Sequence, residues 1–134
     1  MGQRNMPLLE NLLAAGAARD WDAVTGCVSS DFVITEPDLL PYGGKHYGPA
    51  GFRTMIEIFQ NTWTDLQFEI QVMGEIADSV IMKGLLKAHS TETGRYVEAS
   101  VAEFFTVGNG KLVSSEVFYA NEALVVAALT PGHK

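Results

Sequence analysis

The stretch Tyr96-Val97-Glu98-Ala99-Ser100-Val101-Ala102-Glu103-Phe104-Phe105-Thr106-Val107 decides the fold, because its odd-numbered positions are apolar apart from Glu103. Side chains of a strand point alternately to its two faces, so the pattern predicts a long strand with one face turned toward a core. A carboxyl group on that face costs free energy unless it is paired, hydrogen-bonded or protonated. Because such groups are often kept for chemistry or ligand binding, Glu103 is the first candidate for a functional residue.

A second glutamate occupies the same kind of position earlier in the chain. In Asp31-Phe32-Val33-Ile34-Thr35-Glu36-Pro37, the alternation puts Glu36 on the same face as Phe32 and Ile34. Two inward carboxyl groups from distant segments predict one shared pocket, with Glu36 and Glu103 as its catalytic residues. Their proximity and desolvation would raise at least one pKa, so that one group stays protonated as an acid while the other acts as a base. The alternatives are an exposed strand end for Glu36, and for Glu103 a structural carboxyl group satisfied by strand hydroxyl groups or a tyrosine.

Three helices are predicted before the long strands. Apolar residues at helical spacing indicate a helix from Pro7 to Ala18, and Asp20 is placed to cap a second helix from Trp21 to about Val28. The segment from Asp38 to Gly44 contains proline and paired glycines and is predicted to be a loop. Gly48-Pro49 opens the third helix, because proline suits the first helical position. The apolar stripe of this helix consists of Phe52, Met55, Ile56, Phe59 and Trp63.

After Thr64 the sequence predicts a meander of four long strands. They run over residues 66–72, 80–88, 96–107 and 112–119, and a final short helix runs from Asn121 to Leu129. Thr93-Gly94 and Gly108-Asn109-Gly110 are typical of hairpin turns between strands. Helices first and strands afterwards predict an α+β fold, a single domain over residues 1–134 in which helices pack on one face of a curved antiparallel sheet.

Composition excludes several classes of protein. The formal net charge of -7 argues against nucleic acid and anionic membrane surfaces as partners, because both reward basic patches. A single cysteine, Cys27, excludes an internal disulfide and a cysteine-rich zinc site. A metal site of Glu36, Glu103 and His46 lacks any typical ligand spacing, so we expect neither a metal nor a cofactor. No apolar run reaches the ~18 residues of a membrane span, and no signal peptide is recognised, so a cytoplasmic protein is expected.

The order of the elements resembles the NTF2-like, or SnoaL-like, superfamily, which includes ketosteroid isomerases, polyketide cyclases, limonene epoxide hydrolases and scytalone dehydratases. The resemblance covers roughly residues 8–129. The segments that carry it are Arg19-Asp20-Trp21-Asp22, the strand ending in Glu36-Pro37, Tyr47-Gly48-Pro49, and Gly110-Lys111-Leu112. It implies a sheet curled into a cone, helices packed on the concave face around a pocket, and a homodimer formed through the outer sheet face.

Comparison with the ketosteroid isomerases implies roles for the two glutamates. Glu36 before Pro37 matches their general base, and Glu103 matches the protonated acid that donates a hydrogen bond to the oxyanion. Their oxyanion tyrosine would fall at Leu12, and the catalytic aspartate of the cyclases would fall at Asn121. The Asp-Arg-Asp set of the epoxide hydrolases finds no matching arginine. The resemblance therefore implies proton transfer on a hydrophobic carbonyl compound, with isomerisation, cyclisation and dehydration all open.

Seven further residues are candidates for contact with a hydrophobic small-molecule ligand. Tyr42, His46 and Tyr47 lie in or beside the glycine-rich loop, where binding residues are common, although a plain surface position is an equal alternative for the first two. Core packing is the alternative for the aromatic candidates. The complete set is Tyr42, His46, Tyr47, Phe59, Trp63, Tyr119 and Asn121. A noncatalytic ligand-binding or dimeric interaction module remains the alternative to an enzyme.

The outer face of the Glu103 strand predicts how two copies associate. Its even-numbered residues mix polar and aromatic side chains, as interfaces do. They are Tyr96, Glu98, Ser100, Ala102, Phe104 and Thr106, and Phe118 of the last strand is expected beside them. We therefore expect a homodimer.

Overall fold

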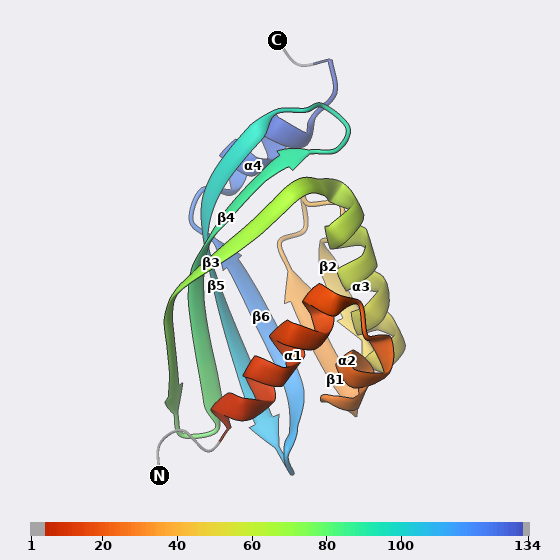
Figure 1. The fold of residues 1–134 in the computed structure, drawn as a ribbon, viewed down its shortest axis with the longest axis vertical. Coiled ribbons are helices and arrows are strands. Elements are labelled where there is room, and N and C mark those ends of the chain that lie inside the picture. The colour runs from red at the N-terminus through yellow and green to blue at the C-terminus, as the bar shows by residue number, and fades with distance from the viewer. Residues whose placement is uncertain (1–4, 133–134) are drawn as a thin grey trace.

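The alternating stretch around Glu103 forms a long strand in the middle of the sheet, as predicted. The structure is a computed structural model that describes residues 5–132. Figure 1 shows its elements, which are α1 (Met6–Ala18), α2 (Trp21–Gly26), β1 (Val28–Glu36), β2 (Gly44–Tyr47), α3 (Gly48–Thr62), β3 (Trp63–Ile76), β4 (Ser79–Ser90), β5 (Tyr96–Gly108), β6 (Lys111–Tyr119) and α4 (Glu122–Leu129). The expected α+β architecture, with helices first and a strand meander afterwards, is confirmed.

The strands form one sheet in the order β2-β1-β6-β5-β4-β3. Neighbouring strands run antiparallel except for β1 and β6, which run parallel. The sheet is therefore mostly antiparallel rather than wholly so. The parallel pair arises because the meander from β3 to β6 returns to the first strand of the chain, far from it in sequence, and inserts its last strand beside it.

The concave face of the sheet carries the core. On β4 and β5 every second side chain is buried, except that Glu103 is half-buried, and the residues between them are more exposed. Figure 1 shows α1 crossing this face of the curved sheet, with α3 beside β1 and β2. Leu9 and Leu12 of α1 and Phe52 and Met55 of α3 are buried there, since each helix turns its apolar stripe toward the sheet. The two helices and the sheet thus enclose the space in which the predicted glutamates lie.

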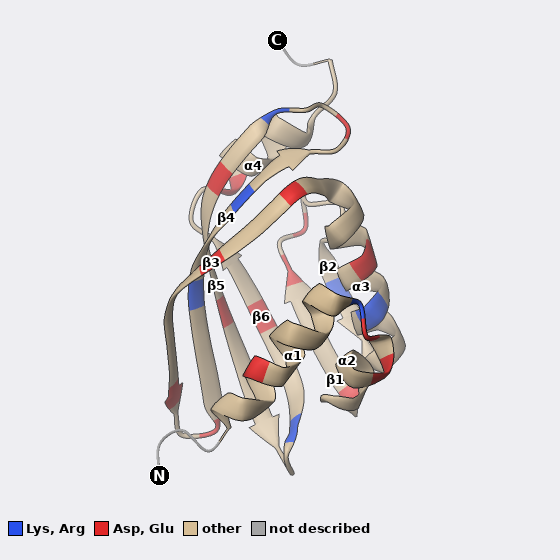
Figure 2. Cartoon of the chain, viewed as in Figure 1, with Lys and Arg blue, Asp and Glu red and all other residues tan. Residues whose placement is uncertain are grey.

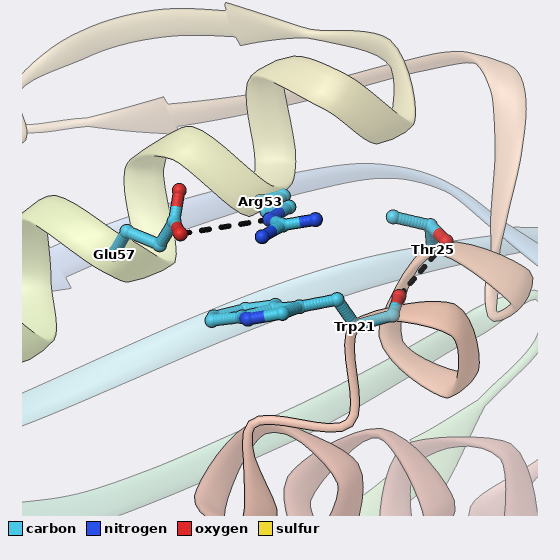
Figure 3. A network of polar contacts seen from close by, with 4 residues as sticks. All are labelled: Trp21, Thr25, Arg53 and Glu57. Atoms are coloured by element: carbon cyan, nitrogen blue, oxygen red, sulfur yellow. Dashed lines mark hydrogen bonds and ion pairs between the residues drawn. The ribbon is translucent and has the colours of Figure 1, made fainter.

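A small contact network links α2 to α3. In Figure 3 the guanidinium group of Arg53 lies over the Trp21 ring, with the Arg53 carbon 5.0 Å from the ring centroid. Arg53 Nε is 3.5 Å from Glu57 Oε2, and Thr25 Oγ1 donates a hydrogen bond of 2.9 Å to the Trp21 carbonyl oxygen. The ion pair is exposed and contributes little by itself. A cation–π contact contributes roughly 0.5–1 kcal/mol at an exposed site, so this network helps to orient α2 on α3.

Three details of the sequence prediction were wrong. The second helix ends at Gly26 rather than near Val28, because Val28 begins β1 and is buried in the sheet, and buried Cys27 caps the helix. Trp63 does not belong to the helical stripe: its backbone is extended (φ -119°, ψ 141°), and it begins β3. Residues 44–47 form the short edge strand β2, which pairs with β1 and was not predicted.

Charged residues lie mainly at the surface. In the view of Figure 2, the Lys and Arg positions of the described residues are scattered over several elements. Within residues 5–132, no helix combines the length and apolar character that crossing a membrane requires.

Candidate functional site

A cavity of about 260 Å³ lies between α1, α3 and the concave face of the sheet. Its walls are mostly apolar: Leu12 and Leu13 come from α1, Met55 and Phe59 from α3, and Phe68 from β3. Glu36 and Glu103 are the charged side chains among the lining residues, and Tyr119 adds a hydroxyl group. The result is a small apolar chamber that holds two carboxyl groups.

Strand pairing places the two glutamates on either side of one residue. Thr35 pairs with Glu116, so the following residues, Glu36 and Val117, lie at the same level of the sheet. Val117 in turn pairs with Glu103 across β5 and β6. Neighbouring strands are about 4.8 Å apart, so the two glutamate backbones are separated by roughly 10 Å, and their side chains project into the same cavity. Period-two alternation thus brings together residues from the first and the fifth strand.

Glu36 is buried among apolar groups. Its side chain is 7% exposed, and its Oε1 atom has no hydrogen-bond partner among the described residues. Burial first, and then the nearby charge of Glu103, raise the pKa of Glu36 from its usual 4.5 to about 9. At neutral pH this side chain therefore holds a proton and can donate it, or a hydrogen bond, to a ligand.

Glu103 is more easily ionised than Glu36. Burial raises its pKa to about 7, while a hydrogen bond donated by Ser115 Oγ to Glu103 Oε2, at 2.6 Å, acts in the opposite direction. Glu103 loses its proton at a lower pH than Glu36 does. The negative charge on Glu103 therefore raises the pKa of Glu36. The arrangement gives one acid and one potential base in the same chamber near neutral pH.

A chain of three aromatic side chains extends from the core to the cavity wall. Tyr42 is fully buried, and its hydroxyl group lies 2.6 Å from the hydroxyl group of Tyr119. Trp63 Nε1 donates a hydrogen bond of 3.2 Å to the same Tyr42 hydroxyl group. The Tyr42 ring also packs edge-on against Phe59, with centroids 5.0 Å apart. Tyr119 and Phe59 line the cavity, whereas Tyr42 and Trp63 lie behind them.

Three of the predicted ligand contacts lie away from the cavity. His46 is half-buried on β2, and its Nε2 atom donates a hydrogen bond of 2.9 Å to the Tyr42 carbonyl oxygen, which ties the loop to the edge strand. Tyr47 is 67% exposed. Asn121 caps α4 by accepting a hydrogen bond of 3.2 Å from the Leu124 N–H group. Edge-strand pairing, solvent exposure and helix capping account for these three positions.

Ser115 is a polar neighbour of the site that the sequence prediction missed. Ser115 is buried on β6 and donates a hydrogen bond to Glu103. A hydroxyl partner of this kind, from a neighbouring strand, was the alternative considered for Glu103. Its signal was the same alternation: Ser115, Val117 and Tyr119 share one face of the last strand. Within residues 5–132, no group of three or more His, Cys, Asp or Glu side chains is arranged to hold a metal ion.

Comparison with known proteins places this architecture in a family. A family model for the SnoaL-like domain matches residues 9–115. No curated protein matches the sequence significantly. The solved structure of an NTF2-like protein from Burkholderia xenovorans is 18% identical, with a TM-score of 0.86, and the match covers 96% of this chain and 98% of that chain.

Two further solved structures resemble the chain and contain small molecules. A protein with a ketosteroid isomerase-like fold from Catenulispora acidiphila, in complex with trimethylamine, is 11% identical with a TM-score of 0.76, covering 92% of this chain and 93% of that one. TerC, co-crystallised with polyporic acid, is 18% identical with a TM-score of 0.77, covering 89% and 93%. At these identities the structural matches establish the fold alone. The family model spans most of the sequence, and the chain therefore belongs to the SnoaL-like domain family and has the NTF2-like fold.

Proposed function

We propose that the cavity binds a hydrophobic carbonyl compound and that Glu36 and Glu103 transfer a proton on it. The observation that carries this proposal is the pair of carboxyl groups in one apolar cavity, where burial raises both pKa values, that of Glu36 to about 9 and that of Glu103 to about 7. Groups that differ in this way can work as acid and base at the same pH. An apolar wall strengthens their electrostatic effect on a bound ligand, because little water competes.

The order of the pKa values supports a division of roles opposite to the one that the family resemblance implies. The Glu103 carboxylate removes a proton from the carbon next to the ligand's carbonyl group, and protonated Glu36 donates to the carbonyl oxygen as the enol forms. In a β,γ-unsaturated carbonyl compound, Glu103 then returns its proton to the γ-carbon as the C=C bond moves into conjugation, and the enol hydroxyl group gives its proton back to Glu36, which completes an isomerisation. Cyclisation and dehydration begin with the same step, so all three remain within this proposal.

The cavity volume supports a small ligand. Ligand pockets commonly enclose about 300–1,000 Å³, and benzene fits an apolar cavity of about 150 Å³. At about 260 Å³, the cavity suits a compound of one or two rings. The bicyclic ketone 1-tetralone meets these requirements, and the protons next to its carbonyl group exchange with solvent when a base removes them.

Proton exchange on 1-tetralone tests the proposal without knowledge of the natural substrate. The exchange rate in D₂O is followed by NMR for the wild type, Glu103→Gln and Glu36→Gln, with the exposed Glu10→Gln as the matched control. General acid–base groups contribute about 10²–10⁴-fold, so Glu103→Gln is expected to lose at least about a hundredfold. Glu36→Gln is expected to be milder, because an amide still donates a hydrogen bond. A larger loss in Glu36→Gln would restore the roles implied by the resemblance.

A noncatalytic ligand-binding module is the second candidate. The mostly apolar lining favours it, as does the absence of the family's tyrosine and aspartate at Leu12 and Asn121. The fold accommodates quite different molecules in its relatives, since one was solved with trimethylamine and another with polyporic acid. Binding of 1-tetralone by the wild type without exchange above the buffer rate would favour this candidate over the enzyme.

We also propose that a second copy of the chain covers the convex face of the sheet. Phe104 and Phe118 are 42% and 48% exposed there, and their rings meet edge-on with centroids 5.8 Å apart. Tyr96 on β5 is 53% exposed. Clustered exposed aromatic side chains are typical of protein interfaces, which supports association through this face.

A further inference from the structure

The buried hydroxyl group of Tyr42 has two polar neighbours and a single hydrogen to donate. Trp63 Nε1 can only donate, so Tyr42 accepts that hydrogen bond with one of its lone pairs. The contact of 2.6 Å between the Tyr42 and Tyr119 hydroxyl groups can run in either direction. The direction matters, because it decides where the hydrogen of Tyr119 points.

Burial decides between the two directions. If Tyr119 donated to Tyr42, the hydrogen of Tyr42 would have no acceptor among the described residues, inside a side chain that is 0% exposed. A buried donor without a partner is costly. If Tyr42 donates to Tyr119, the Tyr42 hydroxyl group both accepts a hydrogen bond, from Trp63, and donates one. The Tyr119 hydrogen is then free, and Tyr119 lies at the cavity wall, where water or a ligand can accept it.

We infer that Trp63, Tyr42 and Tyr119 form a one-way chain of hydrogen bonds that presents the Tyr119 hydroxyl hydrogen to the oxygen of a bound carbonyl ligand. This inference rests on the proposed function and adds a second donor beside Glu36. Tyr119 contacts the ligand, whereas Tyr42 is a positioning residue that acts through Tyr119. The chain supplies the donor that the family resemblance left missing at Leu12, from the opposite side of the cavity.

The surroundings of Tyr119 agree with this role. Burial first, and then Tyr42, Glu36 and Glu103, keep the pKa of Tyr119 well above its usual range, so the hydroxyl group retains its hydrogen. Tyr119 lines the same cavity as the carboxyl groups of Glu36 and Glu103. Because the Tyr119 hydroxyl group accepts a hydrogen bond from Tyr42, it is polarised and donates its own hydrogen bond more strongly. A ligand with a carbonyl oxygen is therefore favoured over a hydrocarbon of the same shape.

The experiment compares 1-tetralone with tetralin, which has the same ring skeleton without the carbonyl group. Equilibrium dialysis gives the dissociation constant of each compound for the wild type, Tyr119→Phe, Tyr42→Phe and the exposed control Tyr47→Phe. Infrared difference spectra of bound 1-tetralone report the carbonyl stretch, which moves to lower frequency when the oxygen accepts a hydrogen bond. Circular dichroism checks that each variant is folded.

One set of results would support the chain. The wild type prefers the ketone, and Tyr119→Phe lowers this preference by roughly three- to tenfold, the range expected for one hydrogen bond. Tyr119→Phe also shifts the carbonyl band back to higher frequency. Tyr42→Phe lowers the preference by a smaller factor, because Tyr119 keeps its hydrogen but loses its orientation, while Tyr47→Phe changes nothing.

Other results would overturn it and are distinguishable from failure of the proposed function. If Tyr119 donates to Tyr42 instead, Tyr42→Phe releases that hydrogen and raises the affinity for the ketone, and Tyr119→Phe leaves it unchanged. Equal affinity of the wild type for both compounds also refutes the chain, although the apolar pocket then stands. Binding of neither compound removes the proposed function, and this inference with it.

Discussion

Replacing Glu36 with glutamine should stabilise the protein, and increasingly so as the pH rises. Glutamine keeps the size of the side chain but removes its titration. In the wild type the pKa of Glu36 is about 9 in the folded state against 4.5 for an ordinary glutamate. The unfolded chain therefore binds fewer protons than the folded one between these values, and the free energy of unfolding falls as the pH rises through this window.

The size of the effect follows from the width of the window. Each pH unit within it removes about 1.4 kcal/mol, so that the full span from pH 4.5 to about 9 is worth on the order of 6 kcal/mol. Glu103 adds its own loss between 4.5 and about 7, which is the same in both proteins as long as Glu36 is neutral. The difference between Glu36→Gln and the wild type should therefore grow by about 1.3 kcal/mol per pH unit between pH 5 and 8, or by about 4 kcal/mol in all.

Urea unfolding at pH 5, 6, 7 and 8, at one fixed protein concentration, measures this difference. Glu10→Gln on the exposed side of α1 is the matched control for the loss of a glutamate at the surface. A gap between Glu36→Gln and the wild type that stays constant, or that shrinks as the pH rises, would refute the reasoning. A constant gap would mean that folding does not shift the pKa of Glu36, and a shrinking gap would mean that folding lowers it.

Two further predictions concern the acid–base pair and the convex face. Ser115→Ala removes the hydrogen bond that opposes the burial effect, so the pKa of Glu103 should rise above about 7, and the proton exchange of 1-tetralone should need a higher pH. An unchanged pH profile would exclude Glu103 as the base. The wild type should sediment as a dimer at micromolar concentration, and Phe104→Glu beside Phe118 should shift it toward the monomer, unlike Leu39→Glu, which alters an exposed residue outside the sheet. A monomeric wild type would contradict the interface.

Alternation along strands was enough to locate both glutamates, because a period of two leaves little freedom once one face is apolar. The same alternation also places Ser115 on the inward face of the last strand, although the sequence analysis did not identify it as a partner of Glu103. The partners of Tyr42 could not be read in this way. Its burial depends on how a proline- and glycine-containing loop folds back against β6, and such a path is set by tertiary contacts rather than by a repeating pattern.

The edge strand β2 and the end of helix α3 could not be predicted from the residue pattern either. The short strand β2 has no alternating apolar face, because it pairs with β1 on one side and forms an edge of the sheet. Trp63 continues the helical spacing of α3 although its backbone has already become extended. In both places the local residue pattern allows two conformations, and sheet pairing selects one of them.

The parallel pairing of β1 with β6 has a consequence for biosynthesis. Ile34 pairs with Ser115, far along the chain, so β6 leaves the ribosome well after β1. Val117 and Tyr119 of β6 line the cavity, so the apolar chamber around Glu36 is complete only once β6 has paired, and burial there raises the pKa of Glu36 to about 9. Such distant pairings also slow folding, because a long loop must close before they form.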